Sequence, residues 1–429
     1  MSRIVIAGGG IAGLEALVAL RRHLGPDPRI DLLESNLELV ERPMAVAEPF
    51  GGAAPRHFDL TGIAADHDAV LRPDRLACVE PTECRLRTVR GDVLEYDALL
   101  VAVGARADIA VPGALTFTGP RDVSALRHLL EGLVARRVRA VAFAVPAAVT
   151  WALPLYELAL MTAEHLRTAR IDDARLVLVT PERDPMEVFG ARIASRIRAL
   201  LAQRGIDLLT ETVPLRVGPG GLVIVGGDAI AVERVVALPH LGGPWIGGLP
   251  HDPDGFIPTD EHGAVPGAPA VWAAGDGTAF PIKQGGLAAQ QADAAAAAMA
   301  AHLGAPLDPA PFRPEVRGLL LDPRGAQVLT QQTGVASDAS TQWPPSKVAT
   351  QYLAPYLATA ANAQAEAVAD REHEDEVDVG ALLLTLAERH IDMGERSLAV
   401  RCLDAAEQLG SDLPANAVEW RRELATPLG

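Results

Sequence analysis

Three glycines near the start of the chain have the spacing of a phosphate-binding turn. Gly8, Gly10 and Gly13 directly follow the apolar run 4–6, and Ala12 lies among them. In such a turn the first glycine permits a tight bend and the second admits a pyrophosphate close to the backbone, while the third lets the next helix pack on the strand. The free N–H groups at the start of that helix favour anions. The pattern therefore predicts a dinucleotide site.

A carboxylate at the end of the next predicted strand supports the same interpretation. The apolar strand 30–33 leads to Glu34, which lies 21 residues after Gly13. A carboxylate in this position accepts hydrogen bonds from the ribose hydroxyls of an adenosine and disfavours a 2′-phosphate. We expect Glu34 and its neighbour Ser35 to contact the nucleotide. The alternative is a glycine-rich turn that binds no ligand.

Two segments far along the chain place small residues and a carboxylate after further apolar strands. The first contains Ala102 and Gly104, and the second contains Gly275 and Asp276. A helix is expected to begin shortly afterwards, within 281–292.

Together these segments resemble the FAD site of the FAD-dependent pyridine nucleotide-disulfide oxidoreductase family, over roughly residues 1–320. The resemblance implies that the turn at Gly104 passes the pyrophosphate and that Asp276 holds the ribityl hydroxyls. It also implies that Gln284 and Gly285 begin the helix beneath the flavin pyrimidine. The N-terminus of such a helix stabilises negative charge on the flavin and so favours its reduction.

Within that family the chain looks most similar to type II NADH dehydrogenases and sulfide:quinone oxidoreductases. The segment 41–50, which includes Arg42, resembles the stretch that lies against the flavin in that branch. By family position, the backbone near Leu76 is a candidate contact of the adenine.

Strands and helices alternate along most of the chain, which indicates parallel sheets covered on both faces. The predicted fold class is α/β, with two Rossmann-like dinucleotide-binding domains and a helical C-terminal region. The family resemblance implies an FAD domain in two pieces, 1–122 and 250–330, interrupted by an NAD(P)-type domain at 123–249. The remaining residues, 331–429, are expected to be mostly helical.

The inserted domain lacks the glycine fingerprint that NAD(P)H-using relatives carry. The corresponding segment, 141–157, contains no glycine, and it includes prolines and Trp151, which would crowd a pyrophosphate. NAD(P)H is therefore an alternative donor that this motif does not support. Glu157 resembles the glutamate that meets nicotinamide in relatives, and it is equally explained as an acidic residue near a helix N-terminus.

Lysine is rare in this chain: Lys283 and Lys347 are the only two. The bias toward arginine is most simply explained by coding composition. Lys283 nevertheless falls inside the flavin motif, where a cation would stabilise reduced flavin. The alternative is a solvated lysine at the start of a helix.

The three cysteines are poorly placed for the redox chemistry that the family commonly uses. Cys78 and Cys84 flank a turn in a predicted meander, and Cys402 lies on the apolar face of a C-terminal helix. We interpret all three as structural. Disulfide reductase and sulfide oxidase activities are thus disfavoured, and no metal site is predicted from the spacing of the histidines.

The formal net charge of −17 argues against binding to nucleic acid or to anionic membrane surfaces. No apolar stretch is long enough for an integral membrane segment, and the start of the chain does not resemble a signal peptide. The odd cysteine count fits a reducing compartment. We therefore expect a cytoplasmic protein.

The C-terminal region is predicted to contain an acidic linker at 370–378 and a helical hairpin at 379–409 that turns near 392–394. The hairpin loosely resembles one tetratricopeptide-type helix pair, which cannot bury its apolar face alone. It is interpreted as a lid or homodimer element, or alternatively as a site for docking a protein partner.

These features predict an FAD-dependent oxidoreductase that passes two electrons to a quinone-like or protein acceptor without a redox-active disulfide. One alternative is an FAD-bearing redox sensor or scaffold that docks a partner through its C-terminal region. A second is an NAD(P)H dehydrogenase with a degenerate nucleotide site. The electron donor is a small molecule or a protein.

Overall fold

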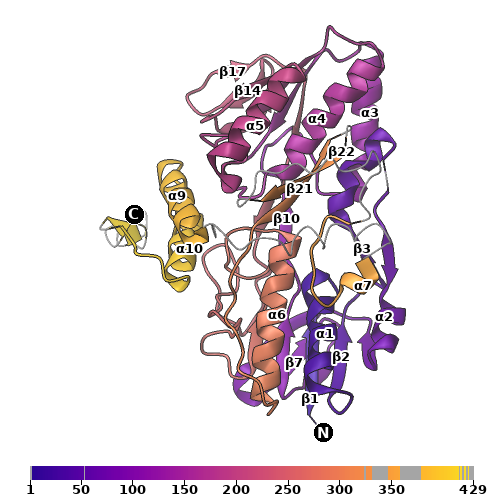
Figure 1. Ribbon diagram of the computed structural model, residues 1–429, viewed down its shortest axis with the longest axis vertical. Coiled ribbons are helices and arrows are strands. Elements are labelled where there is room, and N and C mark those ends of the chain that lie inside the picture. The colour runs from indigo at the N-terminus through magenta and orange to yellow at the C-terminus, as the bar shows by residue number, and fades with distance from the viewer. Residues whose placement is uncertain are drawn as a thin grey trace.

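Figure 1 shows the computed structural model of the chain, which divides into two sheet-containing parts and a helix pair at one side. The structure describes residues 2–52, 54–322, 325–330, 346–357 and 378–414. It also describes Asn416, Ala417, Trp420, Arg421 and Leu424.

The first part is built on a parallel five-stranded sheet with the order β20-β9-β1-β2-β5. Its strands are β1 (Arg3–Ala7), β2 (Arg29–Leu33), β5 (Ala69–Arg72), β9 (Ala98–Val101) and β20 (Val271–Ala273). Alternate residues of β1, β2, β9 and β20 enter two different cores, so the apolar runs in these strands reflect burial on both faces. The helices α1 (Ile11–Leu24) and α6 (Gly285–His302) pack together on one face.

The other face of this sheet is covered by a small antiparallel sheet of order β6-β7-β8. Its strands are β6 (Leu76–Glu80), β7 (Arg85–Thr88) and β8 (Val93–Glu95), with the turn η3 (Pro81–Glu83) between the first two. Smaller elements of this part are β3 (Glu38–Val40), η1 (Arg42–Val46), η2 (Glu48–Phe50), β4 (His57–Asp59), α2 (Leu60–Asp66), and the pair β10 (Arg106–Asp108) and β19 (His240–Gly242). The sequence-predicted meander is thereby confirmed.

The second part contains another parallel sheet, of order β11-β18-β12-β13-β14. Its strands are β11 (Leu115–Thr116), β12 (Ala140–Ala144), β13 (Arg175–Val179), β14 (Ile206–Leu209) and β18 (Arg234–Ala237). One core joins it to α3 (Val123–Val134), α4 (Leu153–Thr168) and α5 (Gly190–Gln203), preceded by η4 (Pro120–Asp122) and η5 (Glu187–Phe189). On the other face lie β15 (Pro214–Gly218), β16 (Gly221–Ile224) and β17 (Ala229–Ile230).

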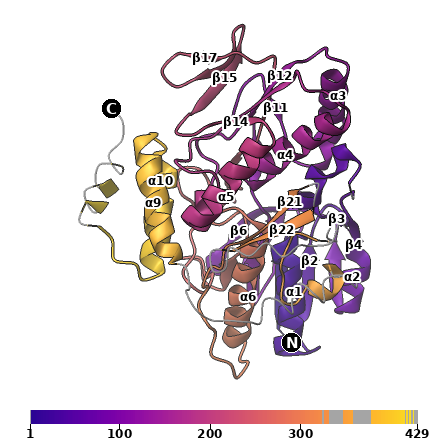
Figure 2. The same ribbon diagram turned by 45° about the horizontal axis from the view of Figure 1, so that its top comes forward.

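The elements after α6 return to both parts. The hairpin of β21 (Arg317–Asp322) and β22 (Gly325–Thr330) lies between the two sheet-containing parts in both views (Figures 1 and 2). The short helix α7 (Ala354–Leu357) lies against the first part. The last helices, α9 (Val379–Asp392) and α10 (Arg396–Gln408), pack on each other and form the yellow pair at the side of the molecule.

A buried carboxylate anchors the segment 346–357 to α1. Glu15 is fully buried, and its two oxygens accept the backbone N–H groups of Gln351 (2.6 Å), Tyr352 (2.7 Å) and Leu353 (2.6 Å). Burial and the neighbouring Glu15 raise the pKa of Asp293 on α6 to about 8. A protonated Asp293 removes the like-charge repulsion that two adjacent carboxylates would suffer.

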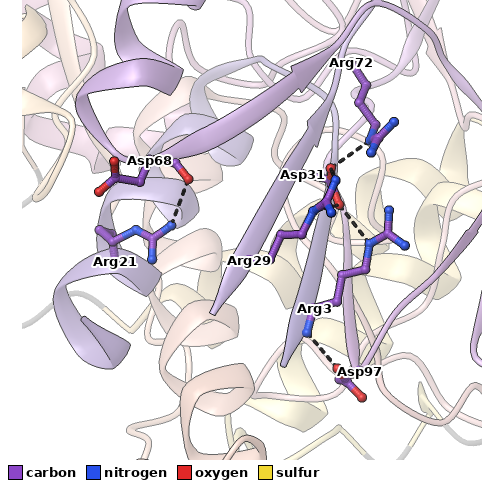
Figure 3. A network of polar contacts seen from close by, with 7 residues as sticks. All are labelled: Arg3, Arg21, Arg29, Asp31, Asp68, Arg72 and Asp97. Carbon is purple, nitrogen blue, oxygen red and sulfur yellow. Dashed lines mark hydrogen bonds and ion pairs between the residues drawn. The ribbon is translucent and has the colours of Figure 1, made fainter. Parts of the chain in front are cut away.

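A second buried carboxylate ties the strands of the first sheet together (Figure 3). Asp31 on β2 is fully buried and lies 2.8 Å from Nε of Arg3, 2.7 Å from Nε of Arg72 and 3.4 Å from Nε of Arg29. Burial alone would raise the pKa of Asp31, but the hydrogen bonds from Arg3 and Arg72 hold it below its ordinary value. The cluster is structural, since these arginines come from three neighbouring strands.

The predicted α/β class with two Rossmann-like sheets and a helical C-terminal part is confirmed. The helical hairpin is found at 379–408, with its turn after Asp392. Residues 358–377, which hold most of the predicted acidic linker, lie outside the described residues. The domain boundaries stay a prediction. No helix in the described ranges is long and apolar enough to cross a membrane.

Candidate functional site

A cavity of about 270 Å³ lies where the two parts and the C-terminal elements meet. Residues between 42 and 46 and between 276 and 285 supply its wall from the first part. The loop 148–154 supplies a wall from the second part, and Lys347 and Arg401 complete the lining from the C-terminal region. The cavity thus joins segments more than 300 residues apart in the sequence.

The glycine turn after β1 has the close packing that its spacing predicts. Gly8 adopts a φ of +114°, and a Cβ there would lie 2.2 Å from the carbonyl oxygen of Ala102. A Cβ on Gly13 would lie 1.8 Å from the carbonyl oxygen of Gly8, so α1 could not keep its place with alanine there. Around Gly10 the corresponding space is open, which leaves its backbone accessible to a ligand. This combination is the one that a pyrophosphate-binding turn requires.

Glu34 follows β2, and hydrogen bonds from nearby residues hold its carboxylate in place. Its Oε2 accepts the backbone N–H of Gly9 at 2.9 Å, and its Oε1 accepts the N–H of Asn36 at 2.8 Å and the hydroxyl of Ser35 at 3.3 Å. The carboxylate therefore lies beside the glycine turn and remains partly exposed. Ser35 is exposed at the same turn.

Gly275 and Asp276 follow β20, next to the start of α1. Gly275 has a φ of +83°, donates its N–H to Gln291 at 2.7 Å, and leaves only 3.1 Å between an added Cβ and the Cβ of Ala12. Asp276 lines the cavity and accepts no hydrogen bond from the described residues. Burial raises the pKa of this carboxyl, against the opposing charges of Lys283 and Arg42.

Lys283 lies in the same wall of the cavity, and its ammonium contacts a backbone carbonyl and an aromatic ring. Nζ donates to the carbonyl oxygen of Thr278 at 2.6 Å and lies 4.0 Å from the ring centroid of Phe256. Burial and the positive charge of Arg401 lower the pKa of Lys283 to about 7, while Asp276 opposes that shift. The side chain can therefore gain or lose a proton near neutral pH.

The N-terminus of α6 points toward the cavity beside this lysine. Gln284 is the N-cap, its Oε1 accepts the N–H of Leu287 at 2.8 Å, and its Nε2 donates to the carbonyl oxygen of Arg317 at 3.2 Å. A Cβ on Gly285 would approach the side chain of Val348 to 3.2 Å. Both Gln284 and Gly285 line the cavity, as expected from the sequence.

Of the other residues predicted to contact the cofactor, one lines this cavity and three lie elsewhere in the first part. Arg42 is exposed and lines it. Ala102 and Gly104 lie after β9, beside the glycine turn, and Gly104 has a φ of +74°. Leu76 begins β6 and is buried in the core on the other face of the sheet, so its adenine contact stays a prediction.

Glu157 does not line the cavity but lies fully buried behind it. Both of its oxygens accept hydrogen bonds from Nζ of Lys347 at 2.6 Å, and Oε1 also accepts the N–H of Leu321 at 2.8 Å. Burial raises the pKa of Glu157, although Lys347 opposes the shift. A contact between Glu157 and nicotinamide would require this ion pair to open, so that role stays a prediction.

Most residues that line the cavity were not assigned a role from the sequence, and two cations and an aromatic ring are among them. Lys347 and Arg401 come from the C-terminal region, and Phe256 comes from the connection before β20. The rarity of lysine was a usable signal for Lys347, since both lysines of the chain line this one cavity. No comparable signal marks Arg401 among the many arginines of the sequence.

All three cysteines are described, all are free, and none lines the cavity. Cys78 and Cys84 belong to β6 and the turn before β7. Cys402 is fully buried on α10, where burial raises the pKa of its thiol to about 12. This environment disfavours the thiolate that redox chemistry requires.

Comparison with known proteins identifies the family. The profile described as Pyridine nucleotide-disulphide oxidoreductase matches residues 2–300, which is more than half of the chain. The chain belongs to this family. As a member, it is an oxidoreductase, and FAD is the cofactor.

Two curated relatives have named activities. An NADH dehydrogenase-like protein of Mycobacterium tuberculosis is 26% identical over 305 residues, covering 64% of this chain and 72% of the relative. The ferredoxin–NAD(+) reductase component of a biphenyl dioxygenase system from Paraburkholderia xenovorans is 28% identical over 303 residues, covering 66% of this chain and 69% of the relative.

Solved structures share the fold. The sulfide:quinone oxidoreductase of Aquifex aeolicus superposes with a TM-score of 0.70 at 19% identity, over 76% of this chain and 83% of that one. A ferredoxin reductase of Rhodopseudomonas palustris gives a TM-score of 0.58 at 20% identity, over 76% and 82% respectively. At this identity the likeness concerns the fold of the oxidoreductase.

The residues of this oxidoreductase fit FAD. The turn at Gly8, Gly10 and Gly13 leaves backbone accessible for a pyrophosphate, and the carboxylate of Asp276 has acceptor capacity for hydroxyl groups. The N-terminus of α6 supplies a positive dipole end at the cavity. Acceptors for sugar hydroxyls, donors for phosphate and a positive field are therefore present among these residues.

Proposed function

We propose that this family member passes two electrons through bound FAD to a quinone-like or protein acceptor, without a redox-active disulfide. The observation that carries the proposal is the cavity at the flavin motif, which contains Asp276 and Lys283 but no cysteine. A protein acceptor is supported by the relative from the biphenyl dioxygenase system, which is named a ferredoxin reductase component.

When bound, FAD supplies the hydride and electron chemistry. The chain itself provides binding, charge and exclusion of water. Gly10 and the start of α1 would hold the phosphates, and Asp276 would hold ribityl hydroxyls. Lys283 places a positive charge at the cavity and, with a pKa of about 7, can hold or release a proton at Nζ.

The cysteine positions support a mechanism without a disulfide. A disulfide relay requires two thiols close to each other and to the cofactor. Cys402 is buried on α10 with a raised pKa, and Cys78 and Cys84 lie outside the cavity wall. A direct transfer between the cofactor and a second substrate in the cavity is the simpler route.

NADH is the donor that the names of the relatives favour. The loop 148–154 argues for a weakened nucleotide site, because Trp151 and Pro154 line the cavity where a glycine fingerprint would leave backbone free. An NAD(P)H dehydrogenase with a degenerate site is therefore the second candidate.

Stopped-flow absorbance of the FAD-loaded protein at about 450 nm tests the proposal, with NADH, NADPH and sulfide offered separately. We expect NADH or NADPH to bleach the flavin and sulfide to fail. The matched control replaces all three cysteines by serine (Cys78→Ser, Cys84→Ser, Cys402→Ser). Loss of flavin reduction or reoxidation in that variant, with FAD still bound, would show that thiol chemistry is required.

A further inference from the structure

The helix pair α9–α10 contributes directly to the cavity. Leu398 and Arg401 of α10 line it. Two sets of ion pairs hold the helix pair in place: Arg389 of α9 binds Glu187 of the second part, and Arg401 binds Asp252 and Asp254 of the first part. The helix pair therefore spans both parts of the molecule at the cavity.

Arg401 retains donor capacity after making these ion pairs. Its Nη1 lies 2.9 Å from Asp252 and 2.7 Å from Asp254, whereas its Nε is buried and has no partner among the described residues. The side chain is only 6% exposed, yet the residue lines the cavity, and the two aspartates do not. The guanidinium carbon of Arg401 lies 4.6 Å from the ring of Phe256, which also lines the cavity, whereas the two counter-charges are absent from the cavity wall.

A second cation lies at the same end of the cavity. Lys283 Nζ is 4.0 Å and Arg401 Cζ is 4.6 Å from the centroid of the same ring, that of Phe256. The lining of the same cavity also includes the apolar side chains of Trp151 and Leu398. A ligand that matches this end combines a planar apolar body with a negatively charged oxygen, because charge-assisted hydrogen bonds to a guanidinium are the strong ones.

We propose that Arg401 binds the second substrate, and that α10 makes the cavity selective for a small quinoid compound carrying an ionised oxygen. This inference rests on the proposed function and specifies its acceptor. It gives α10 a role in substrate selection beyond packing. Arg389 is the natural comparison, since it anchors the same helix pair but does not line the cavity.

Two naphthoquinones of similar size test the selectivity. Lawsone, a hydroxynaphthoquinone, is an anion at neutral pH, and menadione, a methylnaphthoquinone, is neutral. Binding of each to the oxidised, FAD-loaded protein is measured from the change in flavin fluorescence, with no electron donor present. The proteins compared are the wild type, Arg401→Gln, Arg401→Lys and Arg389→Gln.

We expect lawsone to bind the wild type more tightly than menadione. Arg401→Gln should weaken lawsone binding about 10-fold, the effect of losing a hydrogen bond to a charged group, and leave menadione binding unchanged. Arg401→Lys should retain part of the preference for the anion. Arg389→Gln should leave the preference intact, even if it loosens the helix pair.

Equal binding of the two quinones, insensitive to Arg401, would overturn the inference. So would an equal loss of lawsone binding in Arg389→Gln, because Arg401 would then act only in docking α10. Flavin reoxidation is measured separately: if neither quinone reoxidises the flavin, the quinone branch of the proposed function fails, whereas Arg401-dependent binding of lawsone would still support the site.

Discussion

Removing Lys347 should destabilise the protein strongly, because it would leave Glu157 as an unpaired charge in the interior. The side chains of Lys347 and Glu157 are 6% and 0% exposed, and Nζ lies 2.6 Å from each carboxylate oxygen. At that distance, with an effective dielectric constant of about 20, the two charges attract by about 6 kcal/mol. Desolvation offsets part of this attraction in the intact pair.

The change Lys347→Met should lower the free energy of unfolding by about 3–5 kcal/mol, the cost of breaking a buried ion pair from one side. Glu157→Gln should cost less, since the glutamine oxygen still accepts the N–H of Leu321. The double variant should recover much of the Lys347→Met loss, with an interaction energy of about 2–3 kcal/mol.

Urea denaturation followed by tryptophan fluorescence measures these energies, with Arg175→Gln as the control. Arg175 pairs with Asp207 on the surface at 3.0 Å, with side chains 49% and 55% exposed, so its removal should cost below about 1 kcal/mol. In Lys347→Met the pKa of Glu157 should rise further. The loss in free energy of unfolding relative to wild type should therefore shrink as the pH falls and the carboxyl takes up a proton. If Lys347→Met lost no more free energy of unfolding than Arg175→Gln, or if its loss did not depend on pH, the interpretation of Lys347 and Glu157 as a desolvated ion pair would be wrong.

Three other outcomes are expected. Asp31→Asn should lower the free energy of unfolding, measured by urea denaturation, by about 1.5–3 kcal/mol. Because the pKa of Asp31 is lowered in the folded protein, this difference from wild type is complete near neutral pH and shrinks as acid protonates the carboxyl. Gly13→Ala should lower the flavin-to-protein absorbance ratio of the purified protein, because its Cβ would collide with Gly8, whereas Gly62→Ala in α2 should not. Lys283→Met should lower the flavin midpoint potential at acid pH and abolish an inflection near pH 7 in potentiometric titrations, where wild-type Lys283 loses its charge.

Local sequence patterns were sufficient for the fold class, and the residues from Asp276 to Gly285 that the flavin motif singled out line one cavity. Close backbone approaches require glycine at Gly8 and Gly13, and a positive φ favours glycine at Gly275, so these positions can be recognised from the sequence. The helical hairpin predicted at 379–409 is found at 379–408, and Cys402, which the sequence places on an apolar helix face, is fully buried.

The remaining features depend on contacts between distant residues. Lys347 meets Glu157 across 190 positions of sequence, and Arg401 meets Asp252 across 149. Nothing in the local neighbourhood of either residue distinguishes it from an ordinary surface charge. Glu15 is a similar case. It is an acidic residue in the middle of an apolar helix, and only the hydrogen bonds that it accepts from the backbone N–H groups of residues 351–353 explain its position.

The late position of Lys347 and Arg401 in the chain has a consequence for biosynthesis. During translation the glycine turn and the first parallel strands emerge early, and the start of α6 follows. A nascent chain therefore holds most groups expected to contact the cofactor before all residues that line the cavity are in place. The lining of the cavity is completed only when α10 has left the ribosome and Arg401 has packed against Phe256. A nascent chain that has not yet folded α10 therefore lacks Leu398 and Arg401 from the wall of the cavity.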